Sequence, residues 1–69
     1  MKLHYYQDTD SLYIDLAEKP STDTRELAAG VVGDFDADGH LVGLDIDHAS
    51  LVANLSHFEL DALPLKKTA

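Results

Sequence analysis

The sequence contains no cysteine, which excludes a disulfide framework, a thiol nucleophile and any zinc site built on thiolates. It also has no apolar run that approaches the roughly 18 residues of a membrane-spanning helix. A single lysine follows Met1 and polar residues come soon after it, so no secretory signal is recognisable. These absences predict a cytoplasmic protein that uses neither disulfides nor a membrane.

Positive charge is scarce. Five Lys and Arg stand against thirteen Asp and Glu, which gives a formal net charge of −8. A surface with this balance is poorly suited to nucleic-acid phosphates, so nucleic-acid binding is not expected. Residues 34–62 carry seven of the carboxylates and no Lys or Arg. Two interpretations remain open: this excess serves solubility alone, or it attracts a basic protein in a salt-dependent way.

The chain is short, with 69 residues. A domain of this size hides only about 60% of the surface that its unfolded chain exposes. The apolar share of 45% is ordinary for a folded protein. Without disulfides, however, self-association is the usual way for such a small chain to gain a sufficient core. We therefore expect one domain over residues 1–69, frayed at 65–69, that forms a homodimer.

Alternating apolar and polar residues predict two antiparallel hairpins. The first hairpin joins residues 3–6 to residues 12–17 through a segment of turn-forming side chains at 7–11. Residues 18–23 contain a proline and are expected to form the longest loop. The pattern leaves open whether residues 24–28 pair in the sheet.

The second hairpin joins residues 31–35 to residues 41–46. Gly39 suits the positive φ that ends its turn. If Asp36 pairs with His40 across this turn, Val32 lies opposite Leu44. The predicted core face then holds Val32, Val42, Leu44 and Ile46, and the other face holds Val31, Phe35, Leu41 and Asp45.

A short helix is expected after the second hairpin. Asp47 or Ser50 can cap its first turn, and apolar residues follow at helical spacing. Beyond it, Phe58, Leu60 and Leu63 are expected to place the carboxyl-terminal segment on the sheet. The predicted fold is α+β, a four-stranded antiparallel β-meander with one short helix packed on one face.

The stretch from Asp34 to Asp45 has the ligand spacing of an EF-hand calcium loop. An EF-hand needs a helix on each side, whereas the flanking residues alternate as strands do. Asp45 is also shorter than the glutamate that normally closes such a loop. We interpret the stretch as a turn, and we keep weak Ca²⁺ binding at the Asp36–Asp38 turn as an alternative function.

No constellation of residues points to catalysis. The four histidines fall in four different predicted elements, without metal-ligand spacing between any two of them. The serines occupy turns or caps, and the glycines occur singly rather than in a phosphate-binding loop. We therefore expect a non-enzymatic protein with no cofactor and no dedicated metal site.

Several groups of residues resemble a known family. They are Asp10-Ser11-Leu12-Tyr13-Ile14, Thr24-Arg25-Glu26, the block from Asp34 to Ile46, and Ala49-Ser50. Over residues 3–50 the chain is similar to the domain of unknown function 2283, a family of small prokaryotic proteins. This resemblance implies a compact antiparallel sheet with a short helix and no established activity. Related short genes sometimes stand beside small toxin-like proteins, which makes an antitoxin-like role a candidate.

We predict a protein-binding module that is antitoxin-like toward a small basic partner. Its expected contact residues combine acids that attract a basic surface with apolar side chains left partly exposed on the sheet. These residues are Asp34, Asp36, Asp45, Asp47, Glu59, Tyr13, Phe35 and Leu41.

Overall fold

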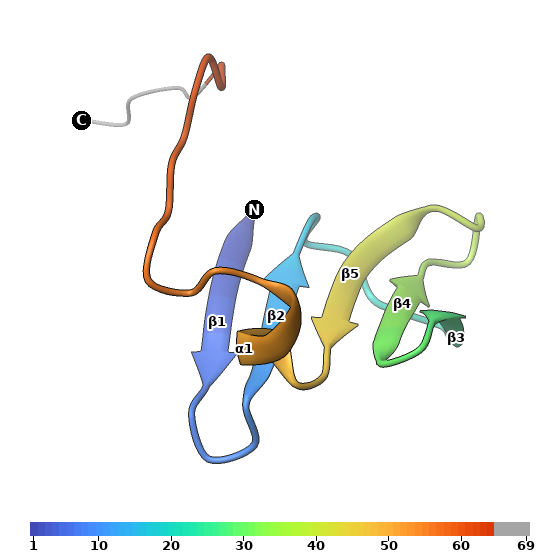
Figure 1. The fold of residues 1–69 in the computed structure, drawn as a ribbon. Helices are drawn as coiled ribbons and strands as arrows, with labels where there is room; N and C mark the ends of the chain where they lie inside the picture. The colour runs from blue at the N-terminus through green and yellow to red at the C-terminus, as the bar shows by residue number, and fades with distance from the viewer. Residues whose placement is uncertain (65–69) are drawn as a thin grey trace.

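The computed structural model describes residues 1–64, which form one five-stranded antiparallel sheet and a single turn of helix. The strands lie side by side in one layer (Figure 1). The frayed tail predicted for residues 65–69 lies outside the described residues. The elements are β1 (Lys2–Tyr6), β2 (Ser11–Asp15), β3 (Asp23–Ala28), β4 (Val31–Phe35), β5 (Leu41–Ile46) and α1 (Ala49–Val52).

The sheet has the strand order β1-β2-β5-β4-β3. The α+β class and the antiparallel pairing are confirmed, but the four-stranded meander is wrong in two respects. Residues 23–28 form a fifth strand beside β4, and β2 pairs with β5. Residues 16–22 carry the chain across the end of the sheet, where the N–H groups of Leu16 and Thr22 donate to carbonyls in or next to β5 and β4. Those bonds join residues far apart in sequence, so local patterning does not reveal them.

A bulge at Val42 changes the register of the β4–β5 hairpin. The Asp36 N–H donates to the His40 carbonyl (2.9 Å), as the turn prediction requires. Because Val42 is an extra residue in β5, every pair beyond it moves by one position. The observed pairs are Phe35–Leu41, Asp34–Gly43, Gly33–Leu44, Val32–Asp45 and Val31–Ile46.

The bulge also changes which side chains share a face, because cross-strand partners point to the same side. Val31 lies with Leu44 and Ile46, whereas Val32 lies on the opposite side, so the predicted core face is confirmed for Leu44 and Ile46 and wrong for Val32. The apolar face comprises Leu3, Tyr5, Leu12, Ile14, Leu27, Val31, Gly33, Phe35, Leu41, Leu44 and Ile46. The polar face comprises Lys2, His4, Tyr6, Ser11, Tyr13, Asp15, Thr24, Glu26, Val32, Asp34, Gly43 and Asp45.

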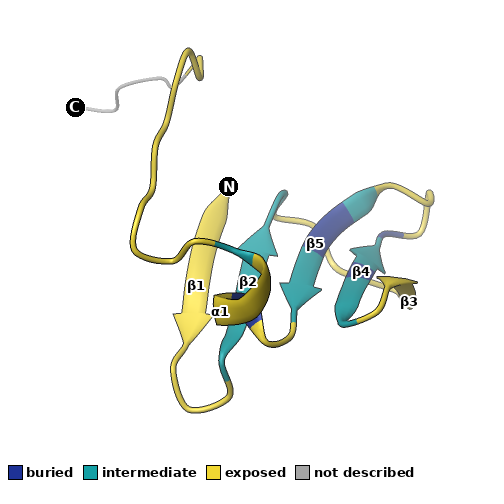
Figure 2. Cartoon of the chain, viewed as in Figure 1, coloured by how far each residue is buried: buried dark blue, intermediate teal, exposed yellow. Residues whose placement is uncertain are grey.

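The sheet encloses little. Among residues 1–64, the buried apolar side chains are Val42 and Ala49, and no large side chain is fully buried. The edge strands β1 and β3 are exposed along their whole length. The middle strand of the sheet, β5, holds two buried residues, Val42 and Gly43 (Figure 2). Few side chains are buried because a sheet needs a second layer to bury its apolar face, and this sheet is a single layer.

Helix α1 is one turn long, and its start differs from the prediction. Neither Asp47 nor Ser50 caps it; His48 occupies the N-cap position in a left-handed conformation (φ 52°), without a side-chain cap. The Ala49 N–H donates instead to the carbonyl of Asp10 (2.9 Å), which places α1 beside the turn between β1 and β2. Within the described residues, no helix has the length and apolar character needed to cross a bilayer.

Candidate functional site

A hydrogen-bonded group of side chains crosses the polar face. The Tyr13 hydroxyl donates to Asp34 Oδ2 (2.9 Å), and the Thr24 hydroxyl donates to Asp34 Oδ1 (3.0 Å). Tyr13 belongs to β2 and Asp34 to β4, so the phenol ring passes over β5. Gly43 permits this crossing, because a Cβ there would stand 2.8 Å from Tyr13 Cζ and closer still to the hydroxyl.

Carboxylates surround this phenol. The hydrogen bond to Asp34 is the largest cause that raises the pKa of Tyr13 to about 12, followed by burial and by the charges of Asp34, Asp15 and Asp45. Tyr13 is therefore a neutral hydrogen-bond donor at physiological pH and not a base. Glu26 extends the same negative surface toward the β3 edge. The arrangement is suited to binding a cationic group.

Basic side chains do little to neutralise this surface. In the part of the chain that the structure describes, the one Lys or Arg bound to a carboxylate is Arg25, whose Nε lies 2.9 Å from Asp23 Oδ2. That pair lies at the opposite face, where the Arg25 guanidinium also stands 4.1 Å from the centre of the Phe35 ring. On the polar face Lys2 lies opposite Asp15, so the charge available to a partner is concentrated at Asp34 and Asp45.

The carboxylate of Asp36 holds the aspartate-rich turn together. Its Oδ1 accepts the backbone N–H groups of His40 and Asp38 (both 2.9 Å), and the bond from His40 is the largest cause that lowers the pKa of Asp36. Ligand atoms of Asp36, Asp38 and His40 lie within 4.8 Å of one another, a spacing that a divalent cation can bridge. Strands flank the turn on both sides, so it is not an EF-hand.

Asp10 links the first hairpin to α1. Its Oδ1 accepts the Tyr5 hydroxyl (2.7 Å) and the Ser50 N–H (3.1 Å), and its Oδ2 accepts the Ser50 hydroxyl (2.6 Å). The Ser50 hydroxyl and then the Tyr5 hydroxyl are the main causes that lower the pKa of Asp10. Asp10 therefore caps the first turn of α1 from another part of the chain.

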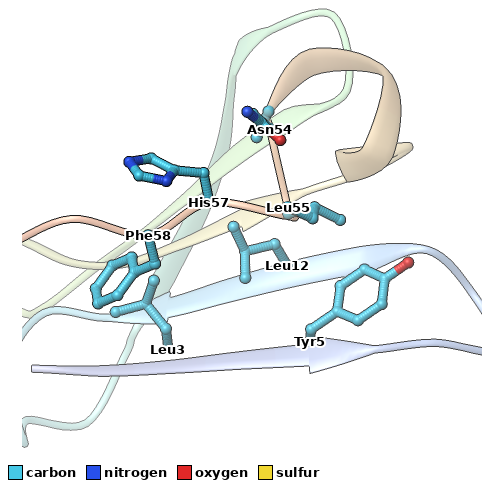
Figure 3. A pocket seen from close by; sticks show the side chains of 8 residues that line it. Leu3, Tyr5, Leu12, Asn54, Leu55, His57 and Phe58 are labelled. Carbon is cyan, nitrogen blue, oxygen red and sulfur yellow. The ribbon is translucent and has the colours of Figure 1, made fainter.

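An apolar cavity of about 400 Å³ lies between the first hairpin and residues 53–58. Leu3, Tyr5 and Leu12 point from β1 and β2 toward this segment (Figure 3). Phe58 lines the cavity and so reaches the sheet, as predicted, although 68% of it is exposed. Leu60 and Leu63 are absent from its lining. Residues 53–58 thus lie over the β1–β2 part of the apolar face without burying it.

The structure brings together some of the predicted contact residues. Tyr13, Asp34 and Asp45 share the polar face. Phe35 and Leu41 lie on the opposite face, so they do not extend the same surface. The eight predicted residues therefore do not form one site.

The other predicted residues lie apart. The Asp36 carboxylate is 8% exposed and engaged by the turn, Asp47 follows β5, and Glu59 belongs to the carboxyl-terminal segment. Asp15 and Glu26 were not predicted, although they lie on the polar face. The alternation of β2 could have indicated Asp15, because it is two residues from Tyr13 and so shares its face.

A protein-family model matches the sequence. The model described as protein of unknown function DUF2283 matches residues 2–50, which is most of the chain. The chain belongs to the DUF2283 family. No curated protein and no solved structure matches it.

The DUF2283 match confirms the resemblance seen in the sequence. It runs from the start of β1 to Ser50, the residue whose N–H and hydroxyl bind Asp10. The family region therefore contains the whole sheet and its link to α1. Residues 53–58, which lie over part of the apolar face, are outside it.

Proposed function

We propose that this DUF2283 protein is a non-enzymatic module of the cytoplasm that binds a small basic protein in an antitoxin-like manner. One observation carries the proposal: Asp15, Asp34 and Asp45 gather around Tyr13 on the polar face. The net charge of −8 also favours a basic partner, because it attracts positively charged proteins from a distance.

The geometry favours recognition of lysine or arginine side chains. The carboxylates stand on strands β2, β4 and β5, so the sheet fixes their spacing and little ordering is needed on binding. The neutral Tyr13 hydroxyl is already donated to Asp34, which leaves the surface rich in acceptors. A cationic side chain supplies the donors that such a surface lacks.

Nuclear magnetic resonance titration tests the charge recognition. Labelled protein is titrated with an octalysine peptide at low and at physiological salt. We expect backbone shifts in β2, β4 and β5, and weaker binding as salt screens the charges.

A pulldown from native lysate tests the partner. The immobilised protein should retain a basic protein at low salt and release it at higher salt. No retention at low salt removes the main support for the antitoxin-like role.

Paired variants separate the polar face from net charge alone. Asp15→Asn with Asp45→Asn removes two charges from the face, and Asp8→Asn with Asp61→Asn removes two charges elsewhere. At low salt we expect the first pair to weaken octalysine binding by about tenfold and the second pair by about twofold or less. Equal losses would mean that no particular face binds the peptide.

Divalent-cation binding is the second candidate, favoured by the convergence of Asp36, Asp38 and His40 within 4.8 Å. Because the Asp36 carboxylate already accepts two backbone N–H groups, we expect only weak affinity for Ca²⁺. Titrating CaCl₂ into labelled protein should shift the resonances of residues 36–40 at about 1 mM, the range of weak calcium modules. No shift at that concentration would end this candidate.

A further inference from the structure

Residues 53–58 lie over the apolar face only at β1 and β2, and Leu3 and Tyr5 remain 46% and 40% exposed there. Toward the other edge of the sheet, the side chains of Leu27, Phe35 and Leu41 close over Gly33, and half of Leu27 remains exposed. At the centre, Leu44 and Ile46 remain partly accessible. The face therefore presents apolar side chains from β5 to β4, and near the β3 edge the Arg25 guanidinium lies over the Phe35 ring.

The exposed area of the chain exceeds that of a typical compact monomer. The protein exposes 5631 Å², whereas a folded monomer of 7.5 kDa typically exposes about 4,200 Å². Residues 59–64, which are exposed, contribute to the difference, and a single-layer sheet raises the exposed area in the same direction because nothing stacks on its apolar face. The whole excess is about 1,400 Å², and only the share that lies on the sheet face is available to a partner; a standard interface buries roughly 800 Å² from each partner.

The charges of the chain are separated between the two faces. The pairing of β3 places Asp23 and Arg25 on the apolar side, and these two side chains bind each other. The carboxylates of Asp15, Asp34 and Asp45 lie on the other side. A basic partner is therefore drawn to the polar face, whereas the apolar face suits a partner without excess charge on its contact surface. A second copy of this same face meets that condition.

We propose that the protein is a homodimer in which two copies stack their apolar faces about a two-fold axis. Stacked sheets lie about 10 Å apart, so the product is a two-layer sandwich with both polar faces outward. The acidic groups of the two copies are then separated by more than the Debye length of about 8 Å at physiological ionic strength. Each copy supplies the layer that the other lacks.

Two measurements on the full chain test this dimer. Sedimentation equilibrium should give twice the monomer mass of 7.5 kDa. Isotope-filtered spectra of mixed labelled and unlabelled protein should show contacts between copies among the methyl groups of Ile14, Val31, Leu44 and Ile46. A monomer at all concentrations overturns the proposal, and so do contacts confined to the polar face or to the β1 edge.

Neighbouring residues of β3 provide a matched pair of variants. Leu27→Gln places an amide in the stacked interface, and we expect the dimer dissociation constant to rise at least about tenfold. Glu26→Gln makes a change of similar size on the polar face and should leave that constant unchanged. Equal constants for the two variants contradict the stacking. The octalysine titration measures binding at the polar face alone. The proposed basic partner and the proposed dimer can therefore fail independently.

Discussion

Replacing Gly43 by alanine is expected to destabilise the fold by about 1–3 kcal/mol, the usual cost of forcing an extra group into a packed position. The new Cβ meets the Tyr13 ring, 2.8 Å from Cζ. The ring cannot move away without losing the bond from its hydroxyl to Asp34. Thermal unfolding measures the loss, and each kcal/mol lowers the Tm of so small a domain by about 4–8 °C.

A second readout and a control variant identify the cause. When Tyr13 leaves Asp34, its pKa should fall from about 12 toward the ordinary 10.0, which an ultraviolet titration of the phenol detects. In a Tyr13→Leu background, which lacks the ring and its hydroxyl, Gly43→Ala should cost much less. A cost that stays the same in that background would show that the Tyr13 contact is not responsible.

Both hairpins could be predicted because their signals are local. Period-two alternation indicates β1 and β2, and the turn around Gly39, which fixes the pair Asp36–His40, indicates the hairpin of β4 and β5. The family resemblance to DUF2283 was equally visible in the sequence, because it rests on runs of adjacent residues.

The bulge at Val42 and the fifth strand could not be predicted in the same way. Nothing in Leu41-Val42-Gly43 distinguishes a bulge from regular pairing, yet the extra residue exchanges Val31 and Val32 between the faces. Strand β3 has an exposed and polar sequence, so its alternation carries little signal. Its place is fixed by pairing with β4, which forms between segments rather than within one.

The predicted contact residues were likewise only partly correct. Tyr13, Asp34 and Asp45 were predicted as contact residues from charge and exposure, and the structure places them on one face. Phe35 and Leu41 were assigned to the same partner surface because the predicted register placed them on one face with Asp45, and the bulge at Val42 puts Asp45 on the opposite face. The two faces have different chemistry, which favours different partners: a basic protein on one side and a second copy on the other.

The structural role of Asp10 was also missed, because its partners Tyr5 and Ser50 come from separate elements. Asp10→Asn is expected to lower the Tm by several degrees and to loosen α1. Asparagine tolerates the left-handed backbone found here (φ 53°), so the variant tests the carboxylate rather than the turn. Amide hydrogen exchange at residues 50–53 should rise more than exchange in β5, because Asp10 caps α1 and not the central strand.

The pH dependence of this effect has a definite sign. The Ser50 hydroxyl and then the Tyr5 hydroxyl hold the pKa of Asp10 below its ordinary value of 3.8 in the folded protein. The carboxylate therefore adds stability that is fully present above its unfolded pKa and is lost as the pH falls through the folded pKa. The Tm difference between wild type and Asp10→Asn should accordingly be largest near neutral pH and shrink in acid.

Asp8→Asn is the matched control, because it removes an equal charge in the same turn without removing these bonds. It should show neither the loss of Tm nor the pH dependence. A similar loss there would assign the effect to net charge instead.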